Sequence, residues 1–147
     1  HEAQKVFWTE LLAQANERSD LHSGISATRD NWVGARRHGH SWTYTVLQDA
    51  TRAELYVDSP VAADNKALFD TLYGHRTAIE ADFGGSLSWQ RLDDKRACRI
   101  SFTVPGGWVD NRTWPAAIEQ SVNAMLRLYG ALSPRVVAAG QVSKGAV

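Results

Sequence analysis

Residues 41–58, "SWTYTVLQDATRAELYVD", decide the fold, because they hold two β-rich runs separated by a short turn. The runs are "SWTYTVLQ" and "RAELYVD", and the "DAT" between them is typical of a hairpin. Side chains alternate along a strand, so the second run has two distinct faces. One face is Ala53, Leu55 and Val57, and the other is Glu54, Tyr56 and Asp58. The stretch therefore predicts an antiparallel pair of strands.

A second hairpin is predicted downstream, where "SLSWQRL" turns back as "RACRISFTV". If Asp93 and Asp94 form a two-residue loop, Arg91 lies opposite Arg96. The alternation in the returning strand predicts that Cys98, Ile100, Phe102 and Val104 point inward and that Arg99, Ser101 and Thr103 point outward. A further short strand is predicted at residues 32–35.

Three segments with apolar residues at helical spacing surround these strands, and they cover residues 3–20, 59–85 and 113–134. Ser59 and Pro60 are typical of the start of a helix. A glycine pair ends the second segment as a left-handed cap would, and a Ser-Pro pair ends the third.

The predicted order is therefore α-β(β)β-α-β-β-α. Short connections favour antiparallel neighbours, with the helices packed on one face of the sheet. We expect the α+β class, with an antiparallel sheet of about four to five strands and three helices. Residues 1–134 should form a single α+β domain, and residues 135–147 a flexible C-terminal tail.

The composition is that of one globular domain, with 147 residues, 16 basic and 16 acidic side chains. Since these charges cancel, any attraction to nucleic acid must come from local clustering. The single cysteine, Cys98, excludes an internal disulfide and suits a reducing cytosol, so we expect a cytoplasmic protein. No apolar run approaches the roughly 20 residues that span a bilayer, so no membrane partner is expected. The first helix starts abruptly, which suggests a fragment of a longer protein or a tag remnant.

Basic side chains gather in two separated segments, "TRDNWVGARRHGHSW" and "RLDDKRACRI". Guanidinium groups bind phosphate in bidentate fashion, and cations beside aromatic residues are typical of surfaces that bind single-stranded nucleic acid. The predicted nucleic-acid-binding residues are Arg29, Trp32, Arg36, Arg37, His38, His40, Arg91, Arg96 and Arg99. The alternative for the first segment is a solvated loop whose two tryptophans point inward. The alternative for the second is a structural turn in which Asp93 and Asp94 neutralise the neighbouring cations.

Two further patterns concern metal chemistry. His38 and His40 have a spacing that on a strand places both on one face, but no third ligand is near them, so no metal site is predicted. A metal-dependent nuclease needs carboxylates beside a lysine, and Mg²⁺ is expected as a cofactor only in that case. The candidate catalytic residues for it are Glu54, Asp58, Lys66 and Lys95. We expect Glu54 and Asp58 to face solvent instead, and Cys98 to be buried and inert.

Five segments resemble those of a known family, and they are "FWTELLAQANE", "SATRDNW", "RAELYVD", "NKALFDTLYGHRTAIEADFG" and "LSWQRLDDKRACRI". The family is the bacterial and archaeal domain-of-unknown-function family 4268, and the resemblance covers residues 6–132. Its most distinctive part runs from Trp89 to Ile100. The resemblance implies a cytoplasmic domain that often lies C-terminal to a predicted nuclease domain, in restriction, repair or phage-defence settings. It implies no catalytic residues.

Three functions remain open from the sequence. The first is a non-catalytic accessory domain of a nuclease-type or phage-defence/restriction protein, which contacts DNA, RNA or an N-terminal nuclease-like domain through an arginine-rich surface. The second is a protein–protein interaction or dimerisation module that pairs with a second copy through exposed tryptophans. The third is the divalent-metal-dependent nuclease. The first requires the guanidinium groups of both basic segments to lie on one side of the folded domain.

Overall fold

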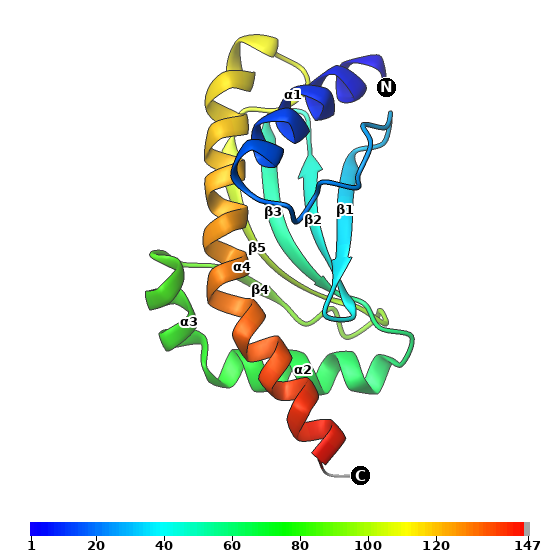
Figure 1. Ribbon diagram of the computed structural model, residues 1–147, viewed down its shortest axis with the longest axis vertical. Helices are drawn as coiled ribbons and strands as arrows, with labels where there is room; N and C mark the ends of the chain where they lie inside the picture. Colours follow the sequence, from blue (N-terminus) through cyan, green and yellow to red (C-terminus); the bar gives the residue numbers. More distant parts are fainter. Residues whose placement is uncertain (146–147) are drawn as a thin grey trace.

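The computed structural model describes residues 1–145 as a five-stranded antiparallel sheet with α-helices on one of its faces (Figure 1). In chain order the elements are α1 (Glu2–Arg18), β1 (Trp32–Arg37), β2 (His40–Val46), β3 (Ala50–Val57), α2 (Ala62–Gly74), α3 (Arg76–Phe83), β4 (Ser88–Gln90), β5 (Cys98–Pro105), the 3₁₀ turn η1 (Asn111–Thr113) and α4 (Trp114–Gly145). This arrangement confirms the predicted α+β class. None of the described helices combines the length and the apolar character that a membrane crossing requires.

The strands follow the order β1-β2-β3-β5-β4, and every neighbouring pair is antiparallel. The predicted hairpin of residues 41–58 is β2–β3, and its three predicted inward residues on β3 are all buried. The short strand predicted before it is β1, which ends in a two-residue turn of His38 and Gly39. Both residues have positive φ, 58° and 82°, which is the geometry of a tight hairpin. This turn fixes the register of β1 against β2.

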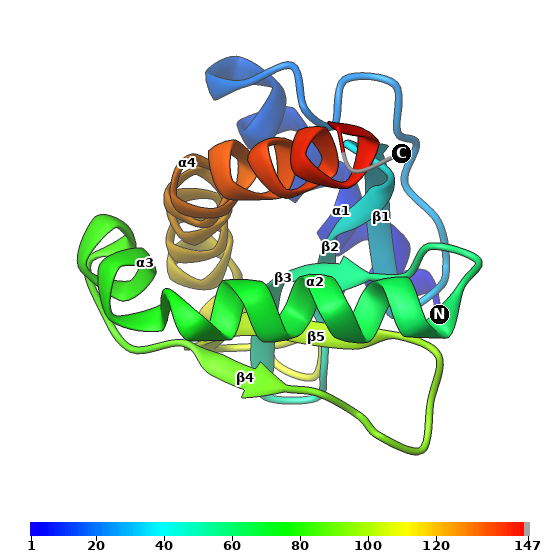
Figure 2. The ribbon, with the colours of Figure 1, turned by 90° about the horizontal axis from the view of Figure 1, so that it is seen from below.

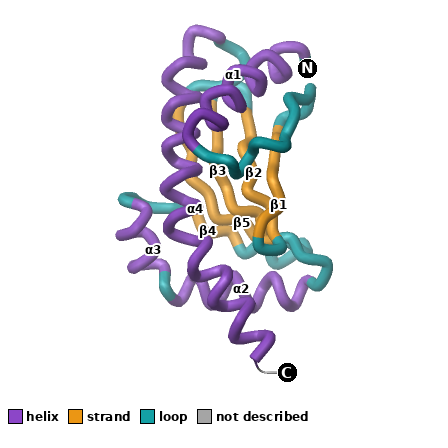
Figure 3. The backbone as a smooth tube through the Cα atoms, viewed as in Figure 1, coloured by secondary structure: helices purple, strands orange, loops and turns teal. Residues whose placement is uncertain are grey.

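The hydrophobic core lies between the sheet and the helices. α4 packs against β2, β3 and β5, and α1 packs against α4. Figures 1 and 2 show both helices over the same face, while α2 crosses the lower end of the sheet. The largest buried side chains of the two helices include Phe7, Trp8, Leu11, Met125 and Leu128. In Figure 3 the orange strands lie behind the purple helices, so within residues 1–145 the opposite face has no helix over it.

The second predicted helix has different bounds from those expected. It begins at Ala62, so Pro60 does not occupy its first turn. The chain leaves helical geometry at His75, where φ is −108° and ψ is 18°, and this residue separates α2 from α3. Gly84 then ends α3 with a φ of 91°, the left-handed conformation expected of a glycine cap. The structure therefore has four described α-helices, one more than predicted.

The last helix is longer than predicted, because α4 continues through Pro134 to Gly145. The predicted tail of residues 135–147 is thus helical as far as it is described, and residues 146 and 147 lie outside the described part of the chain. A proline inside a helix costs about 3 kcal/mol. Leu132 and Val136 are buried on either side of this one, so the apolar stripe continues past it and offsets that cost.

The second predicted hairpin has a longer loop than expected. β4 pairs with β5 only over Ser88–Gln90, so residues 91–97 form the loop and Arg91 does not lie opposite Arg96. The predicted inward residues of β5 do face the core. Ser101, however, was expected to be solvent-exposed and is only 2% exposed.

Candidate functional site

The open face of the sheet carries three rows of side chains that cross the strands. The first row is Trp32, Thr45, Arg52 and Thr103, the central row is Gly34, Thr43, Glu54, Ser101 and Ser88, and the third row is Arg36, Ser41, Tyr56, Arg99 and Gln90. None of these residues is Ala, Val, Leu, Ile or Met. The central row has small side chains apart from Glu54, and the two flanking rows hold the large side chains. The central row therefore forms the floor of a trough that crosses the strands. A cavity of about 580 Å³ lies along it.

Glu54 lies at the centre of the trough and is only 2% exposed, so the expectation of a solvent-facing carboxylate is wrong. Its Oε1 accepts hydrogen bonds from Thr45 Oγ1 (2.8 Å) and Arg52 Nε (3.0 Å). Its Oε2 accepts one from Arg99 Nε at 2.7 Å. A buried carboxylate is strongly unfavourable unless its charge is compensated, and two guanidinium groups compensate it here. The Arg52–Glu54–Arg99 cluster therefore keeps one positive charge in excess.

The two arginines of this cluster use only part of their hydrogen-bonding capacity on Glu54. Each guanidinium group has five N–H donors, and the bonds to Glu54 use only the Nε–H of each. Both side chains are 22% exposed, so the remaining donors are accessible from the cavity that they line. Arg99 also lies over the ring of Tyr56, with its Cζ 5.4 Å from the ring centroid. Such preoriented donors are suited to a phosphate or a carboxylate.

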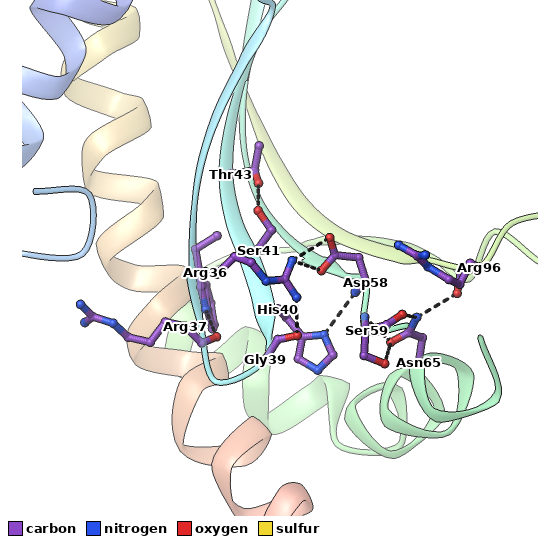
Figure 4. A network of polar contacts seen from close by, with 11 residues as sticks. Arg36, Arg37, Gly39, His40, Ser41, Thr43, Asp58, Ser59, Asn65 and Arg96 are labelled. Carbon is purple, nitrogen blue, oxygen red and sulfur yellow. Dashed lines mark hydrogen bonds and ion pairs between the residues drawn. The ribbon is translucent and has the colours of Figure 1, made fainter. Parts of the chain in front are cut away.

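A second polar network lies at the lower end of the open face, where Arg36 meets Asp58 (Figure 4). Arg36 Nη1 donates to both carboxylate oxygens, at 3.0 and 3.1 Å, and Nη2 donates to Gly39 O at 2.8 Å. The backbone N–H of Asp58 donates to His40 Nδ1 at 3.2 Å, and burial lowers the pKa of His40. Figure 4 also shows the Arg96 side chain extending toward Asp58 from the loop before β5. Arg36 and Arg99, one from each arginine-rich segment, lie in the same row of the open face.

Gly34 keeps the trough open at the β1 edge. A Cβ atom at this position would lie 2.7 Å from both Ser41 Oγ and Thr43 Oγ1. Those two hydroxyl groups are hydrogen-bonded to each other at 2.7 Å and line the cavity. Trp32 stands beside this opening and is 54% exposed. The edge of the trough thus combines an exposed aromatic ring with accessible hydroxyl groups.

The other predicted arginines near the N-terminus point away from the open face. Arg29 forms an ion pair with Glu2 of α1, with Nε and Oε1 2.5 Å apart. Arg37 pairs with Asp20 at 3.5 Å, and its Cζ lies 5.8 Å from the ring centroid of Tyr129 on α4. Both arginines have an acidic neighbour on the helix side of the domain. The predicted binding residues therefore do not form a single surface.

The hairpin tip, residues 91–97, is fastened to α2. Lys66 Nζ donates to three backbone oxygens of this loop, at 2.5, 2.7 and 2.8 Å. Arg91 pairs with Asp70 of α2, with Nε and Oδ1 2.9 Å apart, and this contact lowers the pKa of Asp70. The cations at the base of the tip thus hold the loop in place. Arg91 Nη1 also pairs with Asp93, as the structural-turn alternative expects for that aspartate.

Of the residues considered for a metal-dependent nuclease, the two carboxylates line the same cavity and the two lysines lie outside it. The carboxylates of Glu54 and Asp58 are both engaged by arginines on the open face. Lys66 is bound to the hairpin tip, and Lys95 belongs to that loop. Within residues 1–145, no three His, Cys, Asp or Glu side chains lie close enough together to hold a metal ion. The carboxylates and lysines therefore do not share a site.

Three other residues discussed from the sequence have structural contacts. His38 lies in the β1–β2 turn and not on a strand face, and its Nε2 is 3.0 Å from Tyr129 Oη. Trp42 is fully buried and its Nε1 donates to Arg37 O at 3.0 Å, whereas Trp32 points outward. Cys98 is buried as expected, and burial raises the pKa of its thiol.

Three residues of the open face, Arg52, Thr45 and Tyr56, were not predicted as site residues from the sequence. The signal was present, because strand alternation already placed Glu54 and Tyr56 on one face, and Arg52 continues that face by one step. The neighbours across the strands could not be identified without the register. The register brings Thr45 beside Arg52 and Arg99 beside Tyr56.

A family model described as "Domain of unknown function (DUF4268)" matches residues 3–136, which confirms the resemblance seen over residues 6–132. No curated protein matches the chain. The matched range includes every residue that lines the trough.

Proposed function

The chain belongs to the DUF4268 family of domains of unknown function, and we propose that it is a non-catalytic accessory domain that binds single-stranded nucleic acid across the open face of its sheet. The observation that carries this proposal is the Arg52–Glu54–Arg99 cluster. Its buried carboxylate holds two guanidinium groups by Nε, no described hydrogen bond engages their terminal N–H groups, and both arginines line the cavity. A phosphate of the nucleic-acid backbone has the charge and the geometry that these donors fit.

Aromatic side chains support a single-stranded ligand over a duplex. Trp32 is 54% exposed at one wall of the trough, and Tyr56 lies in the opposite wall beneath Arg99. Unpaired bases stack on such rings, and base–aromatic stacking is worth about 1–3 kcal/mol per base. In a duplex the base faces are covered by their neighbours. The open face therefore offers phosphate contacts and stacking surfaces together, as single-strand-binding sheets do.

The charge of the trough predicts weak and salt-sensitive binding. Three of the residues that line it are arginines and two are carboxylates, so their net charge is one positive (3 − 2). The whole chain is formally neutral. Phosphate contacts of this number position a ligand without reading its sequence. By its resemblance to family members, the chain would serve a nuclease-type or phage-defence protein in the cytoplasm.

Fluorescence anisotropy with a fluorescein-labelled 12-nucleotide oligothymidylate tests the proposal. Affinity should fall as salt rises from about 50 to 300 mM, and a duplex of equal length should bind less tightly. Trp32→Ala should lower the affinity about 5- to 150-fold, because it removes one stacking surface worth about 1–3 kcal/mol. Arg36→Gln should reduce the salt slope by about 0.7, the value for one lost phosphate contact on a single strand. Both side chains are exposed, so neither change threatens the core.

Arg112→Gln supplies the matched control. Arg112 is 87% exposed at its side chain, pairs with Asp110 and does not line the cavity. The Arg36 and Arg112 variants lose the same charge, so a surface that binds through general electrostatics would respond equally to both. Equal losses would contradict the proposed site. An affinity that does not change with salt would contradict nucleic-acid binding altogether.

A further inference from the structure

The outer edge of β1 leaves a row of backbone groups without partners. The N–H of Val46 donates to Asn31 O at 2.7 Å, so Asn31 and Val46 form a hydrogen-bonded pair, and every second residue of β1 after Asn31 also bonds to β2. Because this bonding alternates along an antiparallel strand, the N–H and C=O of Trp32, Gly34 and Arg36 point away from β2. β1 is the last strand on its side of the sheet, and among residues 1–145 no hydrogen bond to these six groups is found. Such an edge is a template for another strand.

The sequence of this edge is complementary to itself. When two copies of β1 are antiparallel with Gly34 opposite Gly34, Trp32 of each copy lies opposite Arg36 of the other. All six free groups then form hydrogen bonds, in three pairs of residues. Shifting the register by two residues in either direction loses one of these pairs. A register centred on Arg36 places two arginines opposite each other, which is destabilising.

Side-chain contacts favour the same pairing. The guanidinium group of Arg36 is held by Asp58 and Gly39, so its aliphatic stem lies along the sheet (Figure 4). The exposed ring of Trp32 from the second copy would pack on that stem, as aromatic rings do on the methylene groups of arginine.

We propose that two copies of the chain pair through β1, with Gly34 opposite Gly34, to form one continuous ten-stranded sheet. The two-fold axis of this pairing is perpendicular to the sheet, so both open faces lie on the same side. The central rows of the two copies then meet at Gly34 and their troughs join. The cavity is lined by four strands in each copy, so at about 4.8 Å per strand the joined trough is about 35 Å long.

Site-specific disulfide formation tests the register directly. In a hydrogen-bonded pair the two Cα atoms are about 5.5 Å apart, within the range of a disulfide. Gly34→Cys in a Cys98→Ala background should therefore form a disulfide-linked dimer under mild oxidation without nucleic acid, and twice the mass of 16.3 kDa is expected. Trp32→Cys in the same background is the matched control. In the proposed register its two Cα atoms are about 13 Å apart, so it should remain monomeric.

A second measurement uses the unmodified edge. Sedimentation velocity of the wild-type chain should show a monomer at about 1 μM and a dimer at about 200 μM, as expected for an interface of small area. Gly34→Pro removes the central outward N–H and should weaken association at least 10-fold. Gly34→Ala adds the same Cβ against the Ser41 and Thr43 hydroxyl groups but keeps that N–H, so it should weaken association less than 3-fold. A wild-type monomer at 200 μM overturns the proposal. Equal crosslinking at positions 32 and 34, or none at either in folded protein, overturns the register.

Discussion

Replacing Glu54 by glutamine removes the charge at the centre of the open face without changing the size of the side chain. The carboxylate is 3% exposed at its side chain and accepts three hydrogen bonds. A glutamine retains one acceptor oxygen, which can serve Thr45 and Arg52. Its amide N–H₂ then faces the Nε–H of Arg99, where two donors meet and no hydrogen bond is possible.

The magnitude follows from the bonds that are lost. A hydrogen bond to a charged group contributes about 1.5–3 kcal/mol, and the bond to Arg99 is lost entirely. The two guanidinium groups also lose the charge that separates them. Because both are 22% exposed and can turn toward solvent, the cost stays below the full 3–5 kcal/mol of a broken buried pair. We expect Glu54→Gln to lower the free energy of unfolding by about 2–4 kcal/mol.

Urea unfolding followed by tryptophan fluorescence measures this loss. Glu2→Gln is the matched control, since Glu2 also pairs with an arginine but is 73% exposed, and it should cost less than about 0.5 kcal/mol. In the double variant Glu54→Gln with Arg99→Gln, the two amides can bond to each other, so part of the stability should return. A coupling energy of about 1–2 kcal/mol is expected from this cycle. If Glu54→Gln were as mild as the control, the carboxylate would not organise the cluster.

Four other substitutions test the packing of the fold away from the trough. Lys66→Met removes the ammonium group that holds loop 91–97 and should cost about 2–3 kcal/mol in urea unfolding, whereas an unchanged midpoint would contradict that role. Gly107→Ala places a Cβ against backbone oxygens of the β2–β3 turn and should lower the free energy of unfolding by about 3 kcal/mol. Gly130→Ala is its control, because a Cβ there meets no atom within 4 Å in α4, and it should raise the free energy of unfolding by about 0.5–1 kcal/mol in thermal melts. Burial lowers the pKa of His22 below 6.5, so the folded protein favours the neutral imidazole. As the pH falls below 6.5 the unfolded chain takes up the proton first, and the free energy of unfolding should fall, by at most about 1.4 kcal/mol per pH unit, until the pH has passed the folded pKa. His22→Gln should flatten this decrease in pH-dependent urea titrations.

Sequence periodicity correctly predicted the helices and strands whose buried faces are set by their own residue pattern. Strand alternation placed Leu55 and Ile100 correctly in the core, because a half-buried strand repeats every two residues. The end of α4 was wrong because a local signal, Pro134, was outweighed by tertiary burial of its neighbours. The hairpin tip was wrong because Lys66, distant in sequence, holds its loop open. In each failure a contact between distant residues decided the outcome.

The open face illustrates the same division for the site. Alternation alone put Glu54 on the outer side of β3, and outer residues of an uncovered sheet are usually solvated. Its burial depends on Arg99, which is 45 residues away in the chain and reaches it only through the β3–β5 pairing. The arginines of the two basic segments are likewise divided between the two faces of the sheet, because side chains alternate along each strand. Arg36 and Arg37 are adjacent in sequence and lie on opposite faces.

The cost of the Arg52–Glu54–Arg99 cluster is itself an argument for a ligand. Replacing a buried ionic cluster with apolar or small polar residues of similar volume is often neutral or stabilising, so stability alone does not favour charges at this position. Threonine and serine already fill most of the central row, and they would pack the remaining position without desolvating a carboxylate. What the charges add is orientation, because Glu54 holds two guanidinium groups by Nε and leaves their terminal donors toward the cavity. The free energy lost by burying these charges is recovered only when a bound anion accepts hydrogen bonds from the two arginines.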